Sequence, residues 1–172
     1  MTALIFGFTF TSQAADKSGK YSIGMESGYA IPLGDFSEYH DESVILGANG
    51  GYWINNKILT GLGILYHLNH HNNDSEMGHS INILSVIPQI KVSVFEGPIT
   101  PTAGLGIGIF RYGLSHDGSR ISFGFVPSAE INLDINEYFS LEANLKFNCN
   151  YNFEYNEKVY YLIIGAGANY HF

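Results

Sequence analysis

The chain has 172 residues, a length that suits a single domain and excludes a large multidomain enzyme. Only 14% of the residues are charged, against roughly 25% in an average soluble protein, while the chain holds 20 Gly, 12 Tyr and 12 Phe. This composition is poor for a water-exposed surface, yet a hydrophobic content of 45% excludes a disordered chain.

The charge balance is acidic, with 16 Asp and Glu against 8 Lys and Arg and a formal net charge of -8. No two basic residues are adjacent, so the clustered positive charge behind nucleic-acid affinity is missing and no nucleic-acid partner is expected. The single cysteine, Cys149, permits neither an internal disulfide nor a multi-cysteine metal site. We expect it to act as a small apolar residue, and the sequence indicates no cofactor.

Residues 1–15 differ from the rest of the chain. The first ten are apolar and uncharged, and Ser12-Gln13-Ala14 precedes a polar run. This pattern is typical of a secretory signal peptide cleaved after Ala14 or Ala15, although the basic segment that usually opens such a peptide is missing. The apolar run is too short for a spanning helix, which needs roughly 20 residues; a buried strand or a short anchor is the alternative. The sequence therefore predicts a signal peptide over 1–15 and one domain over 16–172.

Apolar and polar residues alternate at period two in eight segments of the mature chain. In 139–151, the clearest segment, Phe, Leu, Ala, Cys and Tyr fall on one face, and Ser, Glu, Asn and Lys on the other. Such alternation indicates a β-strand with chemically opposite sides. The segments have about ten to fifteen residues, longer than usual soluble strands and sufficient for a tilted membrane-crossing strand of about 9–11. The expected strands are 21–31, 43–54, 58–69, 81–95, 100–112, 121–135, 139–151 and 159–172.

The connections between these segments alternate in length. Those after the second, fourth and sixth strands are tight and consist of turn-forming residues, whereas the others are longer and polar. With an even number of strands, both termini lie at the end with the short turns, as in outer-membrane barrels, whose external loops are long. The expected turns are 55–57, 96–98 and 136–138, and the expected loops are 33–42, 70–80, 114–120 and 152–158.

The polar face distinguishes a membrane barrel from a soluble lipocalin-type barrel, which turns its apolar face inward. More than half of the 20 glycines fall on this face. Glycine weakens a water-facing strand, but inside a narrow barrel it leaves room for large side chains such as Trp53 and Phe110. We therefore expect the polar face to line the lumen and the apolar face to contact lipid. The expected aromatic girdles are Tyr21, Tyr52, Phe95, Phe139, Tyr170 and Phe172 at one interface, and Tyr29, Tyr66, Phe123, Tyr151 and Tyr160 at the other.

Two prolines, Pro88 and Pro127, fall in mid-strand on the apolar face. Because each removes a donor from the hydrogen-bond ladder, we expect a bulge at each, which would shift the facing of the residues beyond it.

The end of the last expected strand resembles the C-terminal signal of bacterial outer-membrane β-barrels. It carries Gly167, Tyr170 and the terminal Phe172 at the spacing of that signal. The segment 28–36, GYAIPLGDF, is similar to the first strand and loop of the small porin-like "outer membrane protein beta-barrel domain" family. The resemblance covers the architecture of the whole mature chain. It implies that these three residues form an assembly signal read by the barrel-assembly machinery.

Five charged residues fall on the predicted lumen face: Glu26, Glu130 and Glu142 against Lys91 and Lys146. Isolated buried charges are costly, so we expect ion pairs across the lumen. We interpret this network as a structural or gating plug, because the interior of an eight-stranded barrel is just wide enough for its side chains to fill. A catalytic carboxylate pair is the alternative, but it needs substrate access that this lumen lacks.

Histidines gather at the end of the third strand and in the loop after it. His70, His71 and His79, with His67 nearby, are candidate ligands for a divalent transition metal, which imidazole binds well. Their spacing matches no defined site, and polar loops often collect such residues. A solvated loop is therefore the preferred interpretation, and no metal is predicted.

We predict an all-β protein, an eight-stranded antiparallel up-and-down transmembrane β-barrel of the bacterial outer membrane with acidic external loops. Its function is structural, surface-interacting or narrowly porin-like, with a largely plugged lumen. The expected partners are outer-membrane lipid, periplasmic chaperones and the barrel-assembly machinery during biogenesis, and a surface partner of the acidic loops; we expect a monomer. The alternatives are a soluble lipocalin-like binder of small apolar ligands and a lipid-modifying barrel enzyme. We predict no enzyme, because no Ser, His and acid fall together on the outward face near a strand end.

Overall fold

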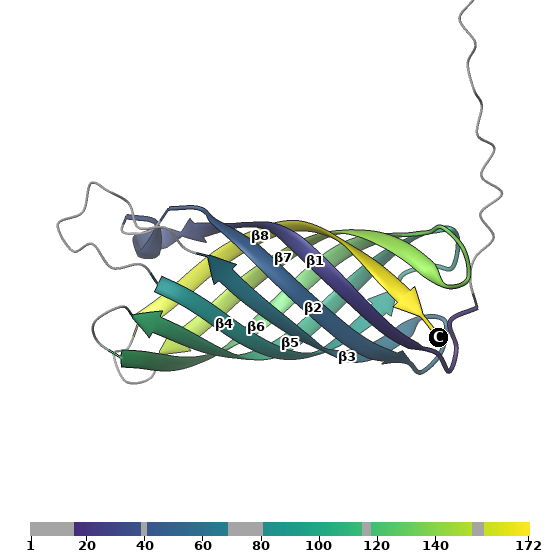
Figure 1. The fold of residues 1–172 in the computed structure, drawn as a ribbon, viewed down its shortest axis with the longest axis horizontal. Helices are drawn as coiled ribbons and strands as arrows, with labels where there is room; N and C mark the ends of the chain where they lie inside the picture. Colours follow the sequence, from purple (N-terminus) through teal and green to yellow (C-terminus); the bar gives the residue numbers. More distant parts are fainter. Residues whose placement is uncertain (1–15, 39–40, 69–80, 115–117, 153–156) are drawn as a thin grey trace, which may run out of the picture.

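The computed structural model describes residues 16–38, 41–68, 81–114, 118–152 and 157–172. They form one closed antiparallel barrel in which each strand pairs with its neighbours in the sequence and the last strand pairs with the first (Figure 1). The strands are β1 Tyr21–Leu33, β2 Ser43–Trp53, β3 Ile58–Leu68, β4 Ile81–Ser93, β5 Ile99–Leu114, β6 Gly118–Asp134, β7 Phe139–Asn152 and β8 Glu157–His171. The predicted eight-stranded up-and-down barrel is confirmed. Among the described residues, no helix is long and apolar enough to cross a membrane.

The start of β1 and the end of β8 lie at the same end of the barrel as the connections β2–β3, β4–β5 and β6–β7 (Figure 1). We call this the inner end and the opposite one the outer end. Two of the inner connections are closed by an asparagine side chain. Asn55 Oδ1 accepts hydrogen bonds from the backbone N–H groups of Lys57 and Ile58 at 2.8 and 2.9 Å. Asn136 Oδ1 does the same for Tyr138 and Phe139. These side-chain turns explain why the sequence signals for the tight connections hold.

The outer connections differ from the prediction in two places. The segment 152–158 is shorter than expected, because β7 continues to Asn152, β8 begins at Glu157, and these two residues pair. The segment 114–120 is not a long loop, because β5 continues to Leu114, β6 begins at Gly118, and these two residues pair. Its polar residues suggested a loop, but outside the membrane a hairpin tolerates polar side chains on both faces. In the first outer connection, the short 3-10 helix η1 (Gly34–Glu38) follows β1 directly. It starts at Gly34, whose positive φ of 65° favours glycine.

The two mid-strand prolines do not produce bulges, so that prediction is wrong. Beside Pro88, Val86 pairs with Ile109 and Gln89 with Gly106, an advance of three residues on both strands. The β6–β7 ladder likewise keeps its register across Pro127. Each proline lacks a pairing partner on one neighbouring strand, β5 for Pro88 and β7 for Pro127. On the other neighbouring strand it stays paired. The missing N–H therefore costs hydrogen bonds but inserts no residue, and the facing of later residues does not slip.

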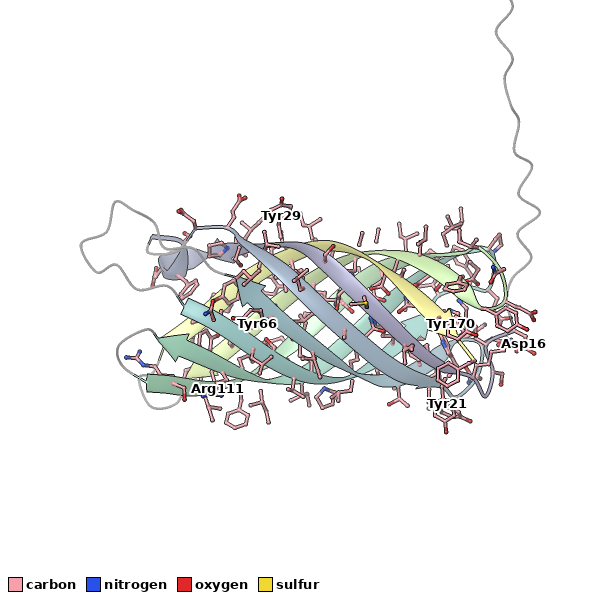
Figure 2. The ribbon with its side chains drawn as sticks, in the orientation of Figure 1. Asp16, Tyr21, Tyr29, Tyr66, Arg111 and Tyr170 are labelled. Atoms are coloured by element: carbon pink, nitrogen blue, oxygen red, sulfur yellow. The ribbon has the colours of Figure 1, made fainter. Side chains whose placement is uncertain are left out.

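Large apolar side chains cover the outside of the barrel. Met25 and Ile107 are 75% and 70% exposed, and exposed Leu, Ile, Val and Phe side chains occur on all eight strands. Figure 2 shows Tyr21 and Tyr170 on the inner end and Tyr29 and Tyr66 nearer the outer end, as the girdle prediction required. Soluble proteins rarely expose apolar patches beyond a few hundred Å². The soluble lipocalin-like alternative is therefore wrong, because this barrel turns its apolar face outward.

Candidate functional site

The five charged residues predicted to face the lumen all do so, and all are buried. Lys91 on β4 forms an ion pair with Glu130 on β6, with Nζ and Oε1 2.8 Å apart. These strands are not neighbours, so the pair reaches across β5. There Gly104 pairs with Lys91, and a Cβ at Gly104 would lie 3.2 Å from Lys91 Cγ and collide with the Ser128 hydroxyl. Glycine on the intervening strand thus makes room for the ion pair.

The second ion pair has the same construction at the seam of the barrel. Lys146 on β7 reaches across β8 to Glu26 on β1, with Nζ 2.6 Å from Oε1 and 2.5 Å from Oε2. On β8, Gly167 pairs with Glu26 on one side and with Glu142 on the other. A Cβ at Gly167 would lie 3.1 Å from Glu142 Oε1. Gly167, predicted as part of the assembly signal, therefore also gives space to the carboxylates in the lumen.

Glu142 is held by amides. Its Oε1 accepts a hydrogen bond from Asn144 Nδ2 at 3.1 Å, and its Oε2 accepts one from Asn169 Nδ2 at 2.9 Å. Asn144 Nδ2 also donates to Glu26 at 2.9 Å, which joins Glu142 to the seam ion pair. We call these five charged residues and the two asparagines the charged layer. Its three carboxylates exceed its two lysines by one, and amide donors stabilise the extra negative charge.

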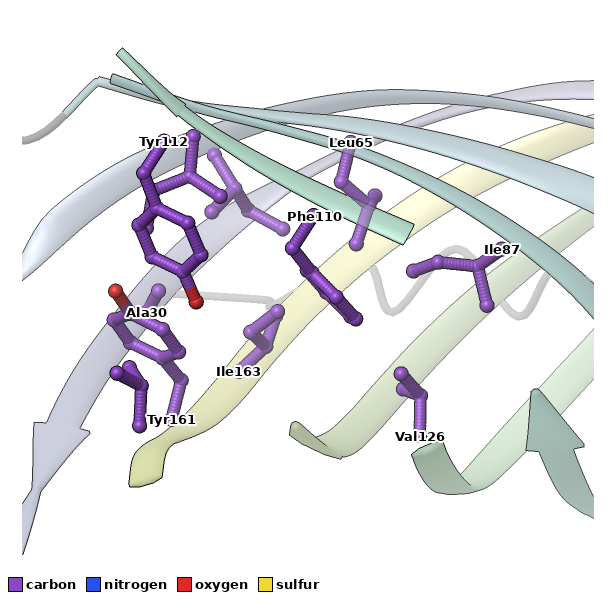
Figure 3. Close-up of a cluster of buried hydrophobic side chains, with 11 residues drawn as sticks. Ala30, Leu65, Ile87, Phe110, Tyr112, Val126, Tyr161 and Ile163 are labelled. Carbon is purple, nitrogen blue, oxygen red and sulfur yellow. The ribbon is translucent and has the colours of Figure 1, made fainter. Parts of the chain in front are cut away.

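Apolar side chains, which we call the apolar layer, fill much of the outer half of the lumen, where the sequence pattern predicts only Phe110 among them. Figure 3 shows side chains from several strands, among them Leu65, Ile87, Phe110 and Ile163, packed against one another inside the barrel. Phe110 and Ile163 are at most 1% exposed. Alternation predicts apolar residues on the outside, apart from large side chains such as Phe110, yet the strands of this half carry them on both faces. Buried polar side chains lie among the apolar ones, since Ser85 and Ser122 both pair in register with Phe110.

An aromatic contact lies at the outer mouth. Phe36 of η1 packs on the apolar layer, and its ring meets that of Tyr161 at 5.1 Å in a T-shaped arrangement. His67 is 1% exposed and also lies against Tyr161, with 5.5 Å between ring centroids. His67 thus belongs to the lumen. His70, His71 and His79 lie outside the described residues, and within those residues no group of three or more His, Cys, Asp or Glu could hold a metal ion.

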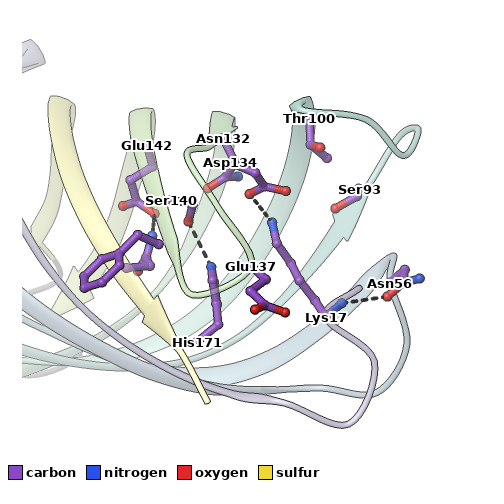
Figure 4. Close-up of polar contacts among 12 residues, drawn as sticks. Lys17, Asn56, Ser93, Thr100, Asn132, Asp134, Glu137, Ser140, Glu142 and His171 are labelled. Atoms are coloured by element: carbon purple, nitrogen blue, oxygen red, sulfur yellow. Dashed lines mark hydrogen bonds and ion pairs between the residues drawn. The ribbon is translucent and has the colours of Figure 1, made fainter. Parts of the chain in front are cut away.

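A third ion pair, which the sequence pattern does not predict, lies at the inner mouth. Lys17 precedes β1, yet its side chain turns into the mouth and its Nζ lies 2.6 Å from Asp134 Oδ1 (Figure 4). The Lys17 ammonium lies 5.1 Å from the centre of the Trp53 ring. Both charged groups are almost fully buried. The signal for Lys17 is faint, because a lysine before the first strand resembles any solvated residue near a chain end.

Ser140, His171 and Asp134 come together at this mouth, but on the lumen side. Ser140 Oγ and His171 Nε2 are 3.0 Å apart. Among the described residues, His171 Nδ1 has no hydrogen-bond partner, and Asp134 is bound to Lys17. A nucleophilic triad needs the acid on the second imidazole nitrogen and a substrate beside the hydroxyl. Ser140 is 1% exposed, so this contact is a structural hydrogen bond.

The two aromatic residues of the predicted assembly signal face outward at the inner end. The rings of Tyr170 and Phe172 stack at 6.0 Å, and Phe172 stacks on Tyr21 of β1 at the same distance. The backbone N–H groups of Tyr21 and Phe172 each donate to the other's carbonyl at 2.9 Å. The chain end therefore completes the β1–β8 seam and part of the inner girdle.

Solved structures identify this architecture. Neisserial surface protein A (NspA) is similar with a TM-score of 0.74 and 13% identity over 90% of this chain and 100% of that one. The fold is that of bacterial outer-membrane β-barrels. OprG from Pseudomonas aeruginosa has a TM-score of 0.58 and 14% identity over 92% and 98%. Ail, the attachment invasion locus protein of Yersinia pestis, in complex with the heparin analogue sucrose octasulfate, has a TM-score of 0.59 and 16% identity over 90% and 99%. Neither a protein-family model nor a curated protein matches the sequence.

Proposed function

We propose that this outer-membrane barrel is a closed, monomeric scaffold that acts through its surface, in membrane integrity or attachment, and that passes little or no solute. The observation that carries the proposal is the filled lumen. Along the barrel, the Lys17–Asp134 ion pair lies at the inner mouth and is followed by the charged layer, the apolar layer and Phe36. The cavity beside Lys91, Glu130 and Glu142 has a volume of about 20 Å³, room for about one water molecule.

Conductance in planar lipid bilayers tests this proposal. We expect no resolvable current from the wild-type protein and a small rise for Lys91→Ala, which leaves Glu130 without its ion pair and opens space in the charged layer. Lys57→Ala, at an exposed lysine of an inner turn, is the control and should stay silent. A large, stable wild-type current would contradict the closed lumen.

The outer rim supports a surface role toward cations. In the first outer connection Asp35, Asp41 and Glu42 are exposed. A negative rim attracts basic partners and repels sulfated polysaccharides. We infer that this chain differs here from Ail, which was solved with a sulfated ligand.

Binding to immobilised polylysine and to immobilised heparin tests the rim. We expect salt-sensitive retention on polylysine and none on heparin. The triple variant Asp35→Asn, Asp41→Asn and Glu42→Gln should weaken polylysine binding by about tenfold, since exposed charge pairs contribute up to about 1 kcal/mol each. Glu96→Gln, which removes an exposed acid at the inner end, should leave binding unchanged in oriented membranes. Equal binding by the triple variant and this control would refute the assignment.

A further inference from the structure

Residues 16–20, which we call the inner strap, lie across the inner mouth. Asn56 Oδ1 accepts hydrogen bonds from the backbone N–H groups of Lys17 and Ser18 at 3.0 and 2.9 Å. The Gly19 N–H donates to the Trp53 carbonyl at 2.9 Å, and the Trp53 N–H donates to the Lys20 carbonyl at 3.0 Å. The strap is therefore tied to the end of β2 and to the turn that follows it.

One side chain of the inner strap enters the barrel. Asp16 and Ser18 are exposed, whereas Lys17 between them is only 5% exposed. Its ammonium has two partners, the Asp134 carboxylate at 2.6 Å and the face of the Trp53 ring at 5.1 Å. A lysine loses side-chain freedom and hydration when it is buried, so this placement persists only because both partners compensate for the loss.

The inner strap separates two spaces. On its water side lies a cavity of about 230 Å³ lined by Lys17, Asn56 and Asp134, among others. On its lumen side lies the cavity of about 20 Å³, whose lining includes Trp53 and His171 at the mouth and Lys91 of the charged layer. Figure 4 shows Lys17 reaching from the mouth toward Asp134. Removing the strap would therefore expose Trp53, and the charged layer behind it, to water from the periplasm.

We propose that the inner strap is a releasable gate that closes the periplasmic mouth of the barrel in series with the charged layer. This inference rests on the closed lumen proposed above and adds how that lumen is regulated. The contacts of the strap suit release. Apart from the Lys17 side chain it is held by a few hydrogen bonds of its backbone and by an exposed contact of the Lys20 ammonium with the Glu137 carbonyl at 3.3 Å, and a Cβ at Gly19 would meet no atom within 4 Å. Segments with few packed contacts open at low free-energy cost.

The single tryptophan of the chain reports directly on the strap. Trp53 is 6% exposed beneath Lys17. We expect Lys17→Ala to raise acrylamide quenching of Trp53 fluorescence about twofold or more and to shift its emission to the red, because one partner of a buried ion pair is lost. Asp134→Asn, which breaks the same pair from the other side, should do likewise. Lys20→Ala is the matched control, because it removes a lysine of the same segment whose ammonium contacts the Glu137 carbonyl on the exposed side and does not contact Trp53 or Asp134 in the described contacts.

These variants are compared as folded proteins in detergent, with folding judged by the faster migration of the unboiled barrel on a gel. The replaced residue lies outside the strands in Lys17→Ala, so the barrel itself should form. Quenching in folded Lys17→Ala and Asp134→Asn equal to that in Lys20→Ala would overturn the proposal that Lys17 seats the strap over the mouth.

Bilayer conductance tests the gate itself. The strap and the charged layer act as two barriers in series. We therefore expect the double variant Lys17→Ala/Lys91→Ala to pass about tenfold more current than the control Lys20→Ala/Lys91→Ala. This ratio corresponds to a difference of about 1.4 kcal/mol in the free energy of opening. Equal currents from the two double variants would overturn the gate. The two proposals can be distinguished. The current through the wild-type protein tests the closed lumen, whereas the Trp53 fluorescence tests the strap independently of any current.

Discussion

Replacing Lys146 with methionine is expected to lower the free energy of unfolding by about 3–5 kcal/mol, because it leaves a buried carboxylate without its cation. Lys146 Nζ contacts both carboxylate oxygens of Glu26, whose side chain is 1% exposed. Within the described part of the chain, the remaining donor to Glu26 is Asn144, which is shared with Glu142. Glu26 would then keep only an amide that it shares with Glu142, in a lumen with little water. Equilibrium unfolding of the detergent-solubilised barrel in guanidinium chloride, followed by Trp53 fluorescence, measures the change.

The control for this effect removes the charge on both sides. Glu26→Gln/Lys146→Met should recover most of the loss, since replacing both members of a buried pair is often close to neutral. Lys20→Met, at a lysine outside the strands, should leave the unfolding midpoint unchanged. If the double variant is less stable than Lys146→Met, the ion pair is not what stabilises this part of the lumen.

The sequence could predict that these charges face inward but not which of them meet. Alternation assigns each residue to a face, whereas its height in the barrel depends on the stagger between strands. Lys91 pairs in register with Gly104 on β5, and Gly104 pairs with Ser128 on β6. The ion pair of Lys91, however, is with Glu130, two residues further along β6. Similarly, Glu26 and Lys146 are 120 residues apart in the chain and meet because β8 closes onto β1. No local pattern encodes either partner.

The apolar layer shows where alternation fails. In β4, Ile83 and Ile87 point into the lumen while Leu84 and Val86 point outward. This part of the strand is then apolar on both faces. Its sequence therefore does not show which face contacts lipid and which faces the lumen. Strands buried on both sides generally lose their alternation. The run INILSVI was therefore itself a signal that this half of the barrel is filled by apolar side chains.

At some lumen positions glycine is required by the backbone that lies beside it. Gly28 on β1 pairs with Gly165 on β8 at the seam. A Cβ at Gly28 would lie 2.7 Å from the Gly165 Cα and collide with the Ile164 carbonyl. Both contacts are with backbone, so no side-chain rotation can relieve them. Gly28→Ala should therefore destabilise the barrel by about 3 kcal/mol, the upper end of the usual cost of overpacking, and reduce the yield of the fast-migrating folded form.

A second glycine provides the matched control. Gly63 on β3 also lies mid-strand and faces the lumen, but a Cβ there would come no closer than 3.6 Å to any atom, the nearest being Nε2 of Gln89. Gly63→Ala carries the same change in unfolded-chain entropy, so it should leave the unfolding midpoint unchanged or raise it slightly. The difference between the two variants isolates the contact across the seam. Equal midpoints would mean that β1 and β8 can separate enough to admit a methyl group, and that close approach of their backbones is not what closes the barrel.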